Sequence, residues 1–158
     1  MLEIVHEPRG ATYEALIRFA LSLRGTFSLV TRGKPLGANA EHDHVLDRLR
    51  PFLIEEMKVK KWPGTRIHGG TAVLHRYRGE PAALTVLVDT VGGLYDWVQV
   101  RRPEDLAFYD TEGRCWLETT THEGDAFIHD ELIDVTRLQK AVPQLTLRSF
   151  PPRKRPAR

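Results

Sequence analysis

Hydrophobic and polar positions along the chain follow two periods, which predict helices and strands in turn. Apolar residues recur every three or four positions over 11–24, as in a helix with one buried side. The same spacing runs over 41–60, where Pro51 interrupts it, so we expect a kinked helix or two abutting helices. Residues 81–91 also fit a helix that stops at Gly92-Gly93, although their β-branched residues would suit a strand.

Strands are predicted where apolar and polar residues alternate with a period of two. In the first half of the chain this pattern marks residues 2–6, 26–32 and 71–78. In the second half it marks 106–110, 115–121, 126–132 and 145–150, with a short helix expected at 136–142. The pattern predicts a single α+β domain over residues 1–150. Two to four helices, mostly in the N-terminal half, are expected to pack on an antiparallel sheet that lies mostly in the C-terminal half.

Size and composition agree with an ordinary globular domain. The chain has 158 residues, of which 41% are hydrophobic and 28% are charged. Its single cysteine, Cys115, cannot form an internal disulfide, and the first residues lack the pattern of a signal peptide. No apolar run approaches the roughly 20 residues that span a bilayer. We therefore expect a cytoplasmic protein that does not contact a membrane.

Charge is distributed unevenly along the chain. The formal net charge is +2, but residues 151–158 alone carry four positive charges, so the rest of the chain has a net charge of −2. We predict that these eight residues form a disordered basic tail after the domain. Between Pro103 and Glu131 there are nine acidic residues and a single basic one, Arg114, which gives this segment a net charge of −8. Asymmetry of this size bears on partners rather than on the fold.

The acidic segment contains the clearest predicted hairpin. Residues 115–121 and 126–132 are expected to pair around a two-residue turn, either Glu123-Gly124 or Gly124-Asp125. The two registers differ by two residues, so both give the same two sides. One side is mostly apolar and is expected to face the core. The outward side carries Trp116, Glu118, Thr120, His122, Asp125, Phe127, His129 and Glu131.

The outward side of the hairpin suggests a contact surface for a protein partner with a basic surface. Exposed aromatic residues anchor interfaces, and acidic residues around them would attract a basic partner. The alternative for the two aromatic residues is that they pack under a neighbouring helix. The sequence thus favours a non-catalytic binding or regulatory protein without a cofactor, such as an inhibitor or immunity protein that covers a toxin. The predicted contacts are Trp116, Glu118, Asp125, Phe127 and Glu131.

Two other functions remain open. Imidazole and carboxylate groups on one side would suit a metal-dependent hydrolase, with His122 and His129 as ligands, although His122-Glu123 does not continue as an HExxH motif. Alternatively, basic residues would neutralise the phosphates of a nucleic acid while Trp62 stacks on a base. The residues predicted for that function are Lys60, Lys61, Trp62, Arg153, Lys154 and Arg155. His75, which alternates with Val73 and Tyr77, is interpreted as a core residue.

Overall fold

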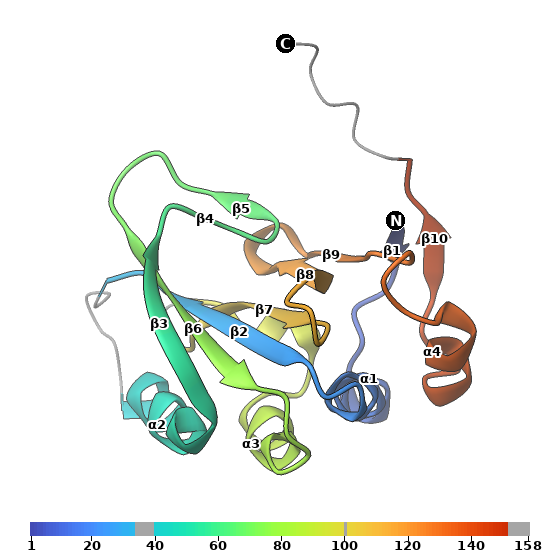
Figure 1. Cartoon of the computed structure of the whole chain (residues 1–158), viewed down its shortest axis with the longest axis horizontal. Helices are drawn as coiled ribbons and strands as arrows, with labels where there is room; N and C mark the ends of the chain where they lie inside the picture. The colour runs from blue at the N-terminus through green and yellow to red at the C-terminus, as the bar shows by residue number, and fades with distance from the viewer. Residues whose placement is uncertain (34–39, 100, 152–158) are drawn as a thin grey trace.

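The centre of the structure is an antiparallel sheet of eight strands, in the order β10-β1-β9-β8-β7-β2-β6-β3 (Figure 1). It comes from a computed structural model, which describes residues 1–33, 40–99 and 101–151. The strands are β1 Leu2–Ile4, β2 Thr26–Thr31, β3 Leu53–Val59, β6 Ala72–Arg78, β7 Glu104–Tyr109, β8 Cys115–Thr120, β9 Asp125–Ile128 and β10 Leu147–Ser149. Two further short strands, β4 Lys61–Trp62 and β5 Thr65–Arg66, pair only with each other.

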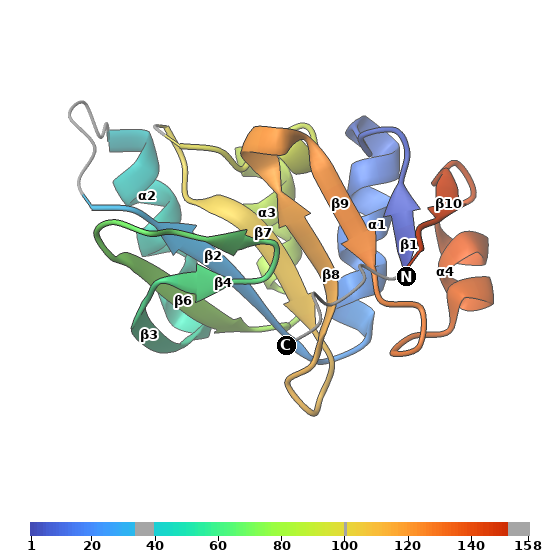
Figure 2. The ribbon, with the colours of Figure 1, turned by 90° about the horizontal axis from the view of Figure 1, so that it is seen from above.

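Helices cover one face of the sheet, and the β4–β5 pair lies over the other (Figures 1 and 2). The α-helices among the described residues are α1 Gly10–Ser22, α2 Ala40–Leu49, α3 Ala83–Thr90 and α4 Val135–Ala141. Short 3-10 turns lie at η1 Arg50–Phe52, η2 Leu94–Asp96 and η3 Thr121–Glu123. The predicted α+β class is confirmed, and the sheet takes four strands from each half of the chain. Residues 152–158 of the predicted tail lie outside the described residues.

The main core lies between the helices and the sheet. On α1, Leu16 and Ile17 are fully buried, and burying such a side chain stabilises a fold by about 1.5–3 kcal/mol. The polar ends of Tyr13 and Trp97 are satisfied inside this core, whereas the indole N–H of Trp116 has no hydrogen-bond partner there. The hydroxyl of Tyr13 donates to the carbonyl of Leu87 at 2.8 Å, and the indole N–H of Trp97 donates to the Tyr13 hydroxyl at 2.9 Å. These bonds connect α1, α3 and the segment before β7.

The prediction for 41–60 is correct for its first half and wrong for its second. The helix ends at Leu49, and after η1 the chain continues as β3, which pairs with β6 from Val59 opposite Ala72 to Leu53 opposite Tyr77. Leu53 and Met57 are four residues apart, as on one side of a helix. In β3 the register shift between Leu53 and Glu55 places Leu53 against the main core and Met57 in the smaller cluster with Leu74. The spacing alone does not show this, and pairing with β6 decides for the strand.

Gly25, between α1 and β2, is required by a close backbone approach. A Cβ atom at this position would lie only 1.8 Å from the carbonyl oxygen of Tyr109 in β7. The left-handed conformation that ends α1 is taken by Arg24, with φ of 58°, although glycine is the usual residue at such a position. The glycine thus serves the contact between the start of β2 and the end of β7.

The two outer strands of the sheet, β10 and β3, both have features that limit pairing with another chain. β10 has only three residues and is followed by Pro151. β3 has seven residues, with a register shift between Leu53 and Glu55 and an exposed Lys58.

Candidate functional site

Trp116, the first predicted contact residue, is fully buried. In the pairing of β7 with β8, Phe108 lies opposite Leu117 and Tyr109 opposite Cys115, so Trp116 is the extra residue of a β-bulge. A bulge breaks the strict alternation of sides and re-aims a side chain. Trp116 therefore packs in the main core, edge-on to Phe19 of α1 with ring centroids 6.1 Å apart. Of the two alternatives for Trp116, an exposed contact or packing under a helix, the structure shows the second, because the bulge turns the ring to the core.

Phe127, the second predicted aromatic contact, lies next to Glu118 across the hairpin but is only 6% exposed. The ring of Phe150, just after β10, packs against it with centroids 5.0 Å apart. β1 lies between β9 and β10 in the sheet, and Glu3 is the neighbour of Phe127 in β1. The alternative in which Phe127 is exposed therefore does not hold either. Its cover comes from a segment far along the chain and not from a helix.

The hairpin between β8 and β9 closes through a longer connection than predicted. Leu117 lies opposite Ile128 and Thr120 opposite Asp125, so residues 121–124 form the connection, with Gly124 at φ of 69°. This register is again shifted by an even number of residues from the predicted ones. The two sides of the hairpin are therefore preserved outside the bulge.

The predicted acidic contacts Glu118 and Glu131 flank one histidine. His129 Nε2 lies 3.4 Å from a carboxylate oxygen of Glu118, and His129 Nδ1 lies 3.6 Å from a carboxylate oxygen of Glu131. The two ring nitrogens point away from each other, so these carboxylates do not converge on one position. His122 lies before β9 and His129 after it, separated by roughly 13 Å of strand. The two predicted metal ligands are thus not brought together, and the described residues contain no group of three metal-ligating side chains suited to an ion.

Much of the negative charge counted over residues 103–131 is buried or paired. Glu104 pairs with Arg32, and Asp105 is buried. Arg114 pairs with two further acids, and Asp130 lies 2.5 Å from the amino group of Met1. The acids of this segment that are neither buried nor paired with an arginine or with the amino group of Met1 in the described chain are Glu118, Glu123, Asp125 and Glu131.

Trp62, predicted to stack on a base, is also buried. It is 3% exposed, and its indole N–H donates to the carboxylate of Asp105 at 2.7 Å. The predicted stacking function is therefore wrong, because the ring faces the sheet and not the solvent. Its neighbours Lys60 and Lys61 are exposed, as expected. The other predicted nucleic-acid contacts, Arg153, Lys154 and Arg155, lie outside the described residues.

Asp105 joins the β4–β5 pair to the sheet. Besides Trp62, its carboxylate accepts hydrogen bonds from the hydroxyl of Thr65 at 3.3 Å and from the backbone N–H of Thr121 at 2.8 Å. Its φ of 56° lies in the left-handed region, which costs a non-glycine residue on the order of 1 kcal/mol. The adjacent Glu104 is also buried, and burial, followed by the charge of Asp105, raises its pKa.

A second buried polar group is centred on His75, which is buried as predicted. Its Nε2 lies 2.9 Å from the hydroxyl of Thr31, and its Nδ1 lies 3.1 Å from a carboxylate oxygen of Glu56. Burial lowers the pKa of His75, so the ring is neutral at pH 7. A hydroxyl, an imidazole and a carboxylate in this order can activate a nucleophile. Here the hydroxyl residue is only 8% exposed, so we interpret the group as a structural link between β2, β6 and β3.

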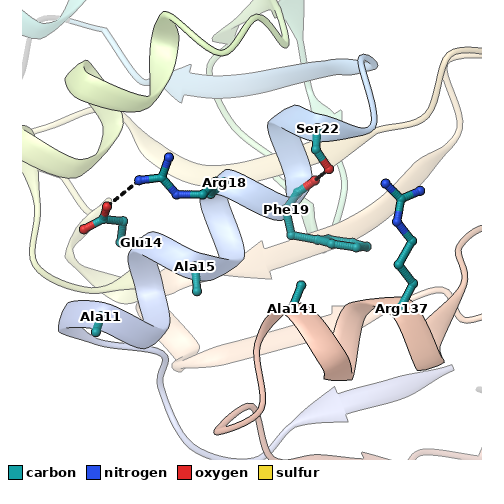
Figure 3. Close-up of a pocket in the computed structure, with 8 residues that line it drawn as sticks. All are labelled: Ala11, Glu14, Ala15, Arg18, Phe19, Ser22, Arg137 and Ala141. Carbon is teal, nitrogen blue, oxygen red and sulfur yellow. Dashed lines mark hydrogen bonds and ion pairs between the residues drawn. The ribbon is translucent and has the colours of Figure 1, made fainter.

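A groove of about 510 Å³ lies between α1 and α4 on the helical side of the molecule (Figure 3). Its lining residues are Ala11, Glu14, Ala15, Arg18, Phe19, Ser22, Arg137 and Ala141. Phe19 extends from α1 toward α4, whereas Arg18 turns to Glu14, with which it forms an ion pair of 2.7 Å (Figure 3). A second hollow of about 180 Å³ shares Ala11 and Ala15 with the groove and continues toward Gln144.

The sequence pattern predicted both helices of this groove but not the groove itself. Its residues lie on the outer sides of α1 and α4, where alanines have no local signal of function. The only signal is that small side chains stand at positions where a surface helix usually carries long polar ones. The groove itself forms only because α1 and α4, which are more than 110 residues apart in the sequence, contact each other in the fold.

Comparison of the chain with models of protein families, with curated proteins and with solved structures finds no match. Among the described helices, none is both long enough and apolar enough to span a bilayer. The site must therefore be interpreted from its own geometry and chemistry.

Proposed function

We propose that the chain is a non-catalytic binding protein and that the groove between α1 and α4 holds a helical segment of a protein partner. The observation that carries this proposal is the groove itself, together with the smaller hollow that continues it. Binding sites are typically concave, mostly apolar and provided with a few polar groups at defined places. The groove has this composition, whereas the outward side of the β8–β9 hairpin offers acids without an exposed aromatic anchor.

The shape of the groove favours a helix as the ligand. Ala11, Ala15 and Ser22 follow the groove along α1, over roughly 17 Å of helix. Small side chains on both walls allow a third helix to approach closely, and Phe19 provides an apolar floor. An amphipathic helix lying in such a groove uses apolar residues at every third or fourth position. A partner helix of about three turns would match this length.

Charge at one end of the groove specifies the partner further. Arg137 lines the groove from α4 and forms no ion pair or side-chain hydrogen bond with any described residue. An acidic side chain of the partner at this end would neutralise it and fix the direction of the helix. The proposed ligand is therefore an amphipathic helix with an apolar side and an Asp or Glu near one end.

The test uses a phage library of random peptides selected on the immobilised full-length protein. We expect enriched peptides with apolar residues at helical spacing and one acidic residue, and their affinities can be measured by fluorescence anisotropy. Ala141→Trp fills the groove and should abolish binding, whereas Ala82→Trp, at the exposed N-cap position of α3, should not. Arg137→Glu should weaken binding at least tenfold, which is about 1.4 kcal/mol, and Lys140→Glu on the same helix should not.

Two results would count against the groove. The first is that enriched peptides bind the Ala141→Trp variant as tightly as the original protein. The second is that selection enriches no peptide above the empty support. Either result would leave the acidic side of the hairpin as the surface for a partner.

A further inference from the structure

A second surface, at the opposite end of the sheet from β10, carries unpaired positive charge. We call residues 58–66, which comprise the end of β3 with β4 and β5, the basic ribbon. From Met57 to Gly79 the sequence has six lysines or arginines and no acidic residue. The exposed cations of the ribbon are Lys58, Lys60, Lys61 and Arg66. None of these four forms an ion pair with the described chain, whereas Arg76 and Arg78 pair with glutamates.

Two of these cations stand directly opposite each other. In the β4–β5 pair Lys61 lies opposite Arg66, and Trp62 lies opposite Thr65. Trp62 and Thr65 point to Asp105, so the other pair faces outward. Opposed side chains in an antiparallel pair have Cβ atoms about 5 Å apart, and like charges at that distance destabilise the pair. An anion held between Lys61 and Arg66 would remove this repulsion.

The ribbon is held rigidly in this arrangement. Trp62 packs with Val30, Ala72 and Leu74 in a small apolar cluster of its own, and Arg32 lies over its ring at 5.1 Å from the centroid. The turn contains Gly64 at φ of 80°, where a Cβ atom would lie 2.3 Å from the Thr120 hydroxyl.

Asp105 fixes the other side of the turn through Trp62 and Thr65, in spite of its strained backbone. A strained conformation that persists is often one that a binding site uses. The backbone that carries the cations is thus fixed before any ligand arrives, which reduces the entropy lost on binding.

We propose that the basic ribbon binds the phosphate backbone of a nucleic acid without reading its sequence. Lys58 and Lys60 lie just before the opposed pair in the chain and are both exposed, and residues two apart in an extended chain are roughly 7 Å apart. Phosphate contacts position a protein but carry no base information, and the ring that would stack on a base, Trp62, is buried. A membrane surface fits less well, because insertion needs exposed apolar residues and the described part of the ribbon has no exposed large hydrophobic side chain. This surface shares no residue with the groove.

The experiment measures binding of the full-length protein to two fluorescent DNA duplexes of unrelated sequence, between about 50 and 200 mM salt. We expect equal affinity for both duplexes and a logarithmic salt slope of about −3 to −4, as four phosphate contacts require. Lys61→Gln with Arg66→Gln should weaken binding at least tenfold and reduce the slope by about 2. The matched control is Arg137→Gln with Lys140→Gln, which removes the same charge from α4 and should leave affinity and slope close to the original.

Several outcomes would overturn the proposal. One is an equal loss in the ribbon and α4 variants, which would show that only net charge matters. Another is unchanged binding in the ribbon variant but loss when Arg153, Lys154, Arg155 and Arg158 are all replaced by glutamine. The absence of binding at about 50 mM salt, or binding to phosphatidylserine vesicles but not to DNA, would also refute it.

Discussion

The β8–β9 hairpin and the basic ribbon carry charges of opposite sign, and they differ in how many of these charges are buried or paired. Around the hairpin, residues 103–131 have a net charge of −8, yet the fold buries or pairs five of the nine acids. On the ribbon all four cations are exposed and without an ion pair in the described chain. The formal charge counted along the sequence therefore overstates the exposed, unpaired charge more for the hairpin than for the ribbon.

The two regions also place their tryptophans differently. Trp116 of the hairpin lies in the main core against α1, whereas Trp62 of the ribbon lies in a separate apolar cluster on the opposite face of the sheet. In both cases the ring attaches a charged segment to the body of the protein. An aromatic residue among charged neighbours can thus mark the point where a segment is anchored, and not where it meets a partner.

The largest effect is expected when the hairpin loses its tryptophan. Trp116→Ala removes a fully buried ring from the main core and should lower the free energy of unfolding by about 3–5 kcal/mol. Urea unfolding followed by circular dichroism measures this value. Trp62→Ala should cost less, because its cluster is smaller. A loss below about 1 kcal/mol for Trp116→Ala would contradict its placement in the core.

The next largest effect is expected at Asp105, which connects the basic ribbon to the sheet. Asp105→Ala leaves two buried donors and one partly buried donor without their acceptor and should cost about 2–3 kcal/mol. It should also release the ribbon, so that trypsin cuts after Lys60 and Lys61 faster than in the original protein. Asp105→Asn keeps an acceptor oxygen and tolerates positive φ, so its effect should be smaller. Equal trypsin rates in all three proteins would show that Asp105 does not hold the ribbon.

A third effect depends on pH and distinguishes the two ends of the sheet. Burial lowers the pKa of His75 in the folded protein. Near pH 6.5 its imidazole therefore binds a proton in the unfolded chain, while in the folded protein it is still mostly neutral. His75 should therefore reduce stability as the pH falls from 7 to 5, by about 1.4 kcal/mol for each unit of pKa difference. Denaturation of His75→Gln across this range should show a weaker pH dependence. His129→Gln, at a partly exposed histidine of the hairpin, is the matched control. A pH dependence of His75→Gln equal to that of the original would contradict the assignment.

The smallest effect on stability is expected for reversing charges on the hairpin. Glu118→Lys with Glu131→Lys changes partly or fully exposed side chains and should shift stability by no more than about 0.5 kcal/mol. If this side holds a basic protein, the variant should lose it in a pull-down, and the purified partner should then show a slower association rate. Asp47→Lys with Asp89→Lys on the helical side controls for net charge. Unchanged association at low salt would exclude the hairpin as the contact surface.

The elements that the sequence predicted correctly have local signals. α3 was expected because Pro81 and Gly92-Gly93 lie at the two ends of an apolar segment. The helix observed there covers Ala83–Thr90. The two sides of the hairpin were predictable because a shift by two residues leaves them unchanged. β3 was not predictable, because its apolar spacing suits a helix equally well and its partner β6 begins 13 residues after it ends.

The site depended on contacts that no local pattern contains. Trp62 meets Asp105 across 43 positions of sequence, and Phe127 is covered by Phe150 only because β10 joins the sheet beside β1. Burial of these rings reversed the sequence-based interpretation of their functions. The exposure of Lys60 and Lys61 was predictable, but the fact that neither forms an ion pair in the described chain was not.

The position of β1 has a consequence for how the protein is made. This strand lies between β9 and β10, with Leu2 opposite both Ile128 and Ser149. On the ribosome, β1 is synthesised before the other strands of this sheet and must wait for almost the whole domain before either neighbour exists, which takes roughly 6–25 seconds at ordinary rates of translation. During that interval its apolar side chains must be shielded from water, either by a nascent-chain chaperone or by transient contact with α1.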